Sequence, residues 1–285
     1  MLCLRPTAGA AAAAEDRAVP RSVTSGRNNR PVFLGVAALV LTASAAATLL
    51  GCASMAAMDG MPMAGGWTLS MAWTPLCGPT WTGAAAGFLG MWGAMMVAMM
   101  LPSVLPAFWR FHEAARMSGA AWPGPLTLVA GIGYFLVWIL LGFVIFLAGS
   151  ELAAIAMRYP GWARAVPGMM GGLLLAAGLF QVSPWKAHML ARCRERPGPG
   201  DATPADVATA LQWGLRLGLR CCLSCAGLVV ILLVLGVMDL GAMGIVTAAI
   251  TLERLAPAGL RVAEAIGCVT AGAGVILITQ AVGFA

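Results

Sequence analysis

The chain has 285 residues, of which 60% are hydrophobic and 10% are charged, and its formal net charge is +6. A soluble domain carries about 25% charged residues, so this composition excludes a soluble globular protein and indicates a polytopic membrane protein. The positive charge requires no nucleic-acid partner, because basic residues in the loops of a membrane protein serve to set its orientation in the lipid bilayer.

The predicted elements begin after an Ala- and Arg-rich segment, residues 1–30, which we expect to be a disordered basic cytoplasmic tail. Residues 31–285 form the predicted transmembrane domain, because several apolar runs approach the roughly 20 residues that a helix needs to cross a bilayer. Helices are expected, since backbone polar groups in lipid must be satisfied within the segment. The predicted spans are Val32–Leu50, Trp81–Leu101, Leu126–Ala148, Val166–Val182, Cys221–Val237, the short Leu240–Leu252, and a last one from about Val262 to Gly283.

These segments predict an all-α polytopic membrane helix bundle with about seven transmembrane helices. The number is six to seven, depending on whether the short segment Leu240–Leu252 crosses the membrane. Loops rich in Lys and Arg stay in the cytoplasm. With seven spans and a cytoplasmic N-terminus, all of the 17 Lys and Arg residues except Arg158 and Arg164 lie in the cytoplasm. We therefore expect an extracytoplasmic C-terminus and a multi-pass protein of the bacterial inner membrane.

An alternative reading concerns the first apolar run. The residues Leu49-Leu50-Gly51-Cys52 resemble a bacterial lipoprotein cleavage site, which would make residues 32–50 a cleaved signal peptide. The run is longer than the usual 7–15 apolar residues of a signal peptide, and the segment before it is longer than usual as well. A first transmembrane helix is the favoured interpretation.

The first candidate metal site lies in the predicted extracytoplasmic loop, residues 51–80, within the stretch MAAMDGMPM. Methionine sulfur is a soft, neutral ligand suited to Cu(I). Gly60 and Pro62 would form a turn that lets several sulfurs surround one ion. The alternative is that these methionines rest in the headgroup layer beside neighbouring tryptophans. The candidate ligands are Met55, Met58, Met61 and Met63.

A second group of methionines occupies the second span. Met91, Met95 and Met99 are spaced i, i+4 and i+8, so they share one helix face, and Met96 and Met100 form a second row beside it. These thioethers are further candidate ligands for a soft metal. The alternative is that they face lipid or fill the core.

A third group, Cys221, Cys222 and Cys225, stands at the cytoplasmic start of the fifth span. In a reducing cytoplasm such thiols bind metal more often than they form a bridge, and both Cu(I) and Zn(II) are open there. The predicted topology places them at the depth of Glu253 and of the last methionines of the second span. The alternative is that the thiols act as small hydrophobic residues that permit tight helix packing.

A few polar residues near the span ends are further candidates. Gln181 is polar within an apolar span and is therefore a functional candidate. Glu253 and Arg254 end the sixth span, where an interhelical ion pair is the expected role. The two histidines, His112 and His188, are expected to be solvated residues in cytoplasmic loops, with a role as ligand as the alternative.

Several segments resemble, in order, the signatures of a bacterial family of predicted metal-binding integral membrane proteins that is defined by a domain of unknown function. They are MWGAMMVAMMLPSVLP, GYFLVW, QVSPWKAHMLARCRE, and GLRLGLRCCLSCAGLVVILLVLGVMDLGAM with the closing LERLAPAG. The resemblance covers a core of about residues 81–267. It implies a metal-binding membrane protein without an established activity, and some members of the family are labelled copper chaperones.

The resemblance also implies functional positions. Besides the methionines of the second span, it marks Gln181, Lys186, the pair Cys193-Arg194, the thiols Cys221 and Cys225, and the pair Glu253-Arg254. The chain departs from the pattern at two points. Leu217 stands where the family has a His, and Ser224-Cys225-Ala226 replaces an adjacent cysteine pair followed by Trp. Both changes weaken a metal site at that turn.

The sequence favours a non-enzymatic protein that binds a soft metal, Cu(I), and exchanges it with a copper-donating or copper-accepting protein. One alternative is an enzyme, either a membrane thiol oxidoreductase that uses Cys222 and Cys225 or a membrane subunit of a copper enzyme. The other alternative is a structural scaffold without bound metal.

Overall fold

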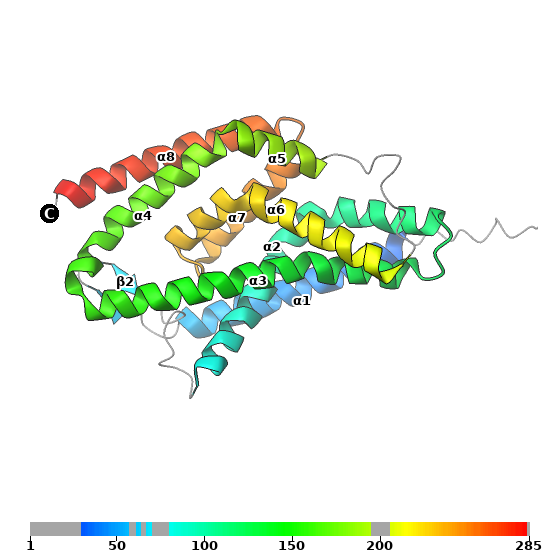
Figure 1. The fold of residues 1–285 in the computed structure, drawn as a ribbon, viewed down its shortest axis with the longest axis horizontal. Coiled ribbons are helices and arrows are strands. Elements are labelled where there is room, and N and C mark those ends of the chain that lie inside the picture. The colour runs from blue at the N-terminus through cyan, green and yellow to red at the C-terminus, as the bar shows by residue number, and fades with distance from the viewer. Residues whose placement is uncertain (1–29, 57–60, 64–66, 70–79, 195–205, 284–285) are drawn as a thin grey trace, which may run out of the picture.

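The computed structural model describes residues 30–56, 61–63, 67–69, 80–194 and 206–283 of the chain (Figure 1). The predicted basic tail lies outside these residues. The described part is helical apart from one short antiparallel hairpin. Its elements are α1 Arg30–Ala56, β1 Met61–Pro62, β2 Thr68–Leu69, α2 Trp81–Met117, α3 Pro123–Arg158, α4 Pro160–Gln181, α5 Pro184–Arg194, α6 Val207–Leu235, α7 Leu240–Leu255 and α8 Gly259–Gly283.

Six of these helices are long and apolar enough to cross a membrane: α1, α2, α3, α4, α6 and α8. The prediction of an all-α membrane helix bundle is confirmed. At about 1.5 Å per residue, the 16 residues of α7 extend over about 24 Å, which is less than the roughly 30 Å of a hydrocarbon core. The number of described helices that are long and apolar enough to span is thus at the lower end of the predicted range, and the orientation of the termini stays a prediction.

The helices α6 and α7 form the centre of the bundle (Figure 1). On one side they contact the pair α4 and α8, which pack along each other. On the other side α3 packs against α6, α2 contacts α7, and α1 lies along α2. Side chains from α2, α3, α6 and α7 therefore meet in the interior, and most of the buried hydrophobic core comes from them.

The helix that contains the second predicted span is longer than that span at its C-terminal end. The prediction ended it at Leu101, but α2 continues through Pro102 and Pro106 to Met117. Proline is tolerated inside helices of a membrane bundle, because neighbouring helices and local adjustments satisfy the freed backbone groups. The helix of the first predicted span is likewise longer than the span, since α1 continues to Ala56.

The extension of α2 corrects the prediction for His112, which was expected to be solvated. Its side chain is only 6% exposed. Its ring packs against Phe33 of α1 and Trp109, and its Nδ1 lies 3.2 Å from Thr127 Oγ1 of α3. The histidine is buried because α2 carries it between α1 and α3 instead of ending before it.

The turn between α6 and α7 has a clear local cause. Gly236 ends α6 with a φ of 120°, a conformation that only glycine adopts without strain. Asp239 then caps α7, because its Oδ1 accepts a hydrogen bond from the Ala242 N–H over 2.7 Å. This short turn folds α7 back against α6 and brings Glu253 towards the middle of the bundle.

Close helix packing depends on glycine where α4 meets α8. A Cβ atom at Gly178 would lie 2.5 Å from the Ala271 nitrogen and 2.7 Å from the Gly267 carbonyl oxygen. Small residues allow backbones in a membrane bundle to approach in this way. The α4–α8 contact therefore has no room for a side chain at residue 178.

Gly178→Ala is expected to lower the free energy of unfolding by about 1–3 kcal/mol, the usual cost of overpacking a filled interface. Thermal unfolding of the detergent-purified protein measures this effect. Gly172→Ala is the matched control on the same helix, because no atom lies within 4 Å of a Cβ built there. Equal stability of the two variants would contradict the packing argument.

Candidate metal centre

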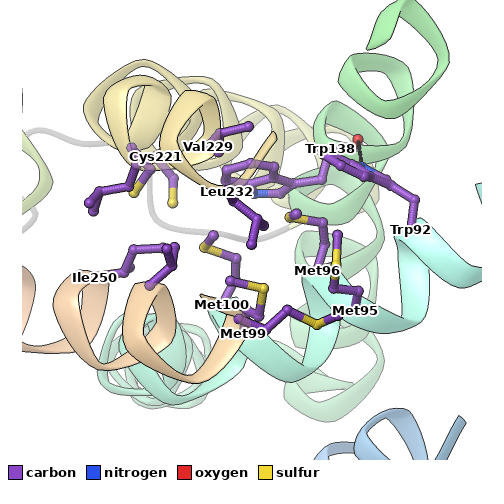
Figure 2. Packing of buried hydrophobic residues seen from close by; sticks show 14 of the residues in the cluster. Trp92, Met95, Met96, Met99, Met100, Trp138, Cys221, Val229, Leu232 and Ile250 are labelled. Carbon is purple, nitrogen blue, oxygen red and sulfur yellow. Dashed lines mark hydrogen bonds between the residues drawn. The ribbon is translucent and has the colours of Figure 1, made fainter. Parts of the chain in front are cut away.

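The methionines of α2 line the interior of the bundle. Met95, Met96, Met99 and Met100 are all buried and belong to one core cluster. The helix is held against α3 at this level, because Trp92 Nε1 donates a hydrogen bond to the Trp138 carbonyl oxygen over 2.9 Å (Figure 2). The thioethers therefore face protein, so the lipid-facing alternative does not apply to these four residues.

Two of the three predicted thiols face the same interior. Cys221 and Cys225 are one helical turn apart on α6, and both are buried. Gly218 brings α6 close to α3, since a Cβ there would lie 2.7 Å from the Tyr134 carbonyl oxygen. The Tyr134 hydroxyl then donates a hydrogen bond to Cys221 Sγ over 3.0 Å.

Thioethers and thiols converge between α2, α6 and α7. Figure 2 shows Met100 directed from α2 into the space bounded by Cys221, Leu232 and Ile250, with Met99 beside it. In the part of the chain that the structure describes, no three His, Cys, Asp or Glu side chains gather as a metal site. The donors available at this point are therefore sulfur atoms, which suit a soft ion such as Cu(I) better than hard cations.

A buried ionic network lies next to the thiols. Lys186 Nζ is 2.8 Å from Glu253 Oε2, and both side chains are 1% exposed. Gln181 Nε2 donates to the other carboxylate oxygen of Glu253 over 2.8 Å, and Lys186 Nζ also donates to the Ser224 carbonyl oxygen. The ion pair predicted for Glu253 is thus present between helices, with Lys186 as the partner. It connects α4, α5, α6 and α7.

The break between α4 and α5 positions two members of this network. Ser183 Oγ donates to the Phe180 carbonyl oxygen over 2.7 Å and accepts from the Lys186 N–H over 3.2 Å, and Pro184 starts α5. Pro is favoured in the first turn of a helix because it lacks an N–H group. The break turns Gln181 at the end of α4 and Lys186 at the start of α5 towards the same carboxylate.

Arg254 lies at the edge of both arrangements. Its Nη1 donates to Ser103 Oγ of α2 over 3.3 Å, and its positive charge acts on the side chains of Cys221, Cys225 and Tyr134. The guanidinium therefore lies between α2 and the thiol pair of α6.

Comparison with known protein families identifies a copper-related family. A family model described as PpoB2, copper chaperone, matches residues 89–277, which is more than half of the chain and includes α2 from Leu89, all of α3 to α7, and most of α8. The chain belongs to this copper chaperone family. Comparisons with curated proteins and with solved structures yield no match.

In this member of the copper chaperone family, the matched region contains the ionic network and all the buried sulfur residues described above. We call the latter the sulfur cluster: Met95, Met96, Met99, Met100, Cys221 and Cys225. The copper-related part of the resemblance is confirmed at the level of the family. The Met-rich loop precedes the matched region. There, Met61 is exposed and Met63 is half-buried next to the pair β1–β2, and Trp67 Nε1 donates to the Ala163 carbonyl oxygen of α4 over 2.9 Å. Met58 and the side chain of Met55 lie outside the described residues.

The remaining predicted ligands lie apart from the centre of the cluster. Met91 is half-buried and packs against Gly51 of α1. Cys222 is half-buried, and His188 on α5 is exposed. The side chain of Cys193 at the end of α5 lies outside the described part. Among the side chains that the structure describes, those of Met91, Cys222 and His188 are not buried together with Cys221 and Cys225.

Sequence reasoning missed two residues that contact the cluster. Tyr134 is one of two tyrosines in the chain and stands within an apolar run, so its hydroxyl was a signal for a buried hydrogen bond. Ser103 lies three residues after Met100, and its Oγ donates to the Met100 carbonyl oxygen over 2.9 Å and accepts a hydrogen bond from Arg254. The expected end of the second span at Leu101 placed this serine outside the bundle.

Proposed function

We propose that this protein holds Cu(I) inside the bundle, between Cys221 and Cys225 of α6 and Met99 and Met100 of α2, and passes it to a partner protein. The observation that carries the proposal is a buried thiol pair that faces thioethers of another helix in one core cluster. Soft sulfur ligands in a water-excluded place favour Cu(I) over harder ions. Membership of a copper chaperone family supports the same reading.

The charges around the cluster support this proposal. Two thiolates and one Cu(I) ion carry a net charge of −1, which is costly to bury without compensation. Arg254 supplies a positive charge that acts on both thiols. Tyr134 supplies a hydrogen-bond donor at Cys221 Sγ. Lys186 is already paired with Glu253, so it adds no net charge to the cluster.

The Met-rich loop takes a second role in this proposal. Met61 and Met63, with Met55 and Met58 of the same stretch, would collect Cu(I) at the end of the bundle where α1 ends and α2 begins. Neutral thioethers are weaker ligands than thiolates, so an ion held by them can move on. The loop would exchange copper with a protein outside the membrane, as the predicted topology places it there.

The test is Cu(I) loading of the detergent-purified protein in competition with a chromogenic Cu(I) chelator. We expect the wild type to retain about one equivalent through its sulfur ligands. The variant Met99→Leu/Met100→Leu is expected to bind Cu(I) about tenfold to a hundredfold more weakly, the range seen when groups that support a metal site are removed. Leu preserves most of the volume of Met, so the stability of this variant should change by less than about 1.5 kcal/mol per site.

The matched control is Met95→Leu/Met96→Leu, which removes two buried thioethers one helical turn before Met99 and Met100 on α2. We expect this control to keep most of the Cu(I) affinity of the wild type. Equal losses in the two pairs would argue against a site at Met99 and Met100. A wild-type protein that retains no copper would refute the proposed function and favour the structural scaffold.

A further inference from the structure

A cavity opens between α2, α6 and the end of α7, with a volume of about 310 Å³. Its walls include Ser103 and Arg110 of α2, Leu217 of α6 and Arg254 of α7. Small-molecule sites begin at about 300 Å³, so the cavity has room for a small ligand and none for a protein domain. The methionine and cysteine ligands proposed above are not in its walls.

The cavity lies one helical turn from the sulfur cluster on two helices. Leu217 precedes Cys221 by four residues on α6, and Ser103 follows Met99 by four residues on α2. Residues four apart lie on the same face of a helix, one above the other. The cavity is therefore a vestibule next to the sulfur cluster, and Leu217, Ser103 and its neighbour Val104 are among the residues that line it.

The vestibule carries positive charge. Arg110 and Arg254 are among its walls, and its walls contain no Asp or Glu within the described structure. The Arg254 guanidinium donates to Ser103 Oγ and acts electrostatically on the thiols, so it borders both the vestibule and the cluster. Two guanidinium groups repel a bare Cu⁺ ion and attract an anion.

We propose that Cu(I) reaches this vestibule as an anionic complex with two thiolates of a small-molecule thiol, and that Arg110 and Arg254 recognise the negative charge of that complex. The inference rests on the proposed function and names the form in which the copper arrives. Guanidinium groups are well suited to anions that carry carboxylates, as many small thiols of cells do. The copper–dithiolate centre of such a complex has a charge of −1, and carboxylates on the thiols add to it. The complex therefore suits a basic vestibule, and the free Cu⁺ ion does not.

The transfer is a ligand exchange without oxidation or reduction. Two Cu–S bonds to the small thiol break and two Cu–S bonds to Cys221 and Cys225 form, while copper stays Cu(I). Each cysteine thiol gives its proton to one leaving thiolate, so two neutral thiols are released. The charge of the copper centre is −1 before and after the step, and Arg254 borders it in both positions.

The experiment compares two copper sources and two arginine variants. The wild type, Arg110→Gln and Arg216→Gln are loaded either from the anionic Cu(I) complex of glutathione or from the cationic Cu(I) complex of acetonitrile. Each variant removes one positive charge from an exposed arginine, and only Arg110 lines the vestibule. Arg216→Gln therefore controls for the change in overall charge. Loading is followed in time by copper content after rapid removal of the unbound complex.

We expect Arg110→Gln to load from the glutathione complex about tenfold more slowly than the wild type, the lower end of electrostatic effects on association rates. Loading from the acetonitrile complex should be unchanged or faster, and Arg216→Gln should match the wild type with both sources. All three proteins should reach the same final copper content, because Arg110 is not a ligand.

Equal rates for the wild type and Arg110→Gln with the glutathione complex would overturn the inference and leave the proposed function intact. Equal slowing in Arg110→Gln and Arg216→Gln would overturn it too, since overall charge and not the vestibule would then control the rate. A wild-type protein that takes copper from neither source would refute the proposed function itself.

Discussion

Lys186→Met is expected to lower the free energy of unfolding by about 3–5 kcal/mol, the cost of removing one partner of a buried ion pair. Lys186 and Glu253 are each 1% exposed, so the carboxylate would remain in the core without its cation. The Lys186 ammonium also donates to the Ser224 carbonyl oxygen of α6, and that hydrogen bond is lost in the same variant. Thermal or chemical unfolding in detergent measures the effect.

The double variant Lys186→Met/Glu253→Gln separates the buried charge from other effects of the substitution. It removes both charges while keeping an amide next to Gln181, and replacing a buried pair by neutral groups is often close to neutral. We expect the double variant to recover most of the stability that the single variant loses. If Lys186→Met were as stable as the wild type, the ion pair between Lys186 of α5 and Glu253 of α7 would not contribute to stability.

Cys221→Ser/Cys225→Ser is expected to abolish retention of Cu(I), from about one equivalent to less than about a tenth, because serine replaces both soft anionic ligands with hard oxygen. The thioethers of Met99 and Met100 remain in this variant, and neutral ligands alone bind Cu(I) more weakly. Copper content after competition with a chelator measures the loss, and a melting curve of the same sample shows whether the variant is folded.

The matched controls are Cys222→Ser, on the half-buried side of the same helix turn, and Cys268→Ser, an exposed thiol of α8. Both should retain copper as the wild type does. Copper retention by the double variant would contradict the proposed centre. If Cys222→Ser instead abolished a mixed disulfide that the wild type forms with a substrate thiol, the thiol oxidoreductase alternative would replace the copper proposal.

Much of the fold could be predicted from hydrophobicity, because a bilayer restricts spanning segments to helices of a minimum length. The apolar runs became α1 to α4 and α6 to α8, and the shortest predicted run became the shortest of them, α7. The boundaries were predicted less well. Pro102 and Pro106 look like the end of a helix in sequence, and neighbouring helices in the bundle allow α2 to continue.

Helical periodicity by itself determined which sulfur atoms share a face. The spacing of Cys221 and Cys225 and of the methionines on α2 follows from 3.6 residues per turn, so it needs no knowledge of the neighbours. Helical periodicity does not determine which face of one helix packs against which face of another. Only the packing of α2, α6 and α7 brings Met100 and Cys221 into one cluster and leaves Cys222 half-buried beside it.

The partners of the polar residues were decided by the tertiary structure. Lys186 counted in sequence as a loop cation that sets membrane orientation, and the break between α4 and α5 instead turns it into the core against Glu253, which is 67 residues away in the chain. Tyr134 and Cys221 are 87 residues apart and hydrogen-bonded. Local sequence determines where a helix can form and which of its faces is apolar. A contact between distant residues depends instead on how the helices cross and on the few glycines that allow their backbones to approach closely.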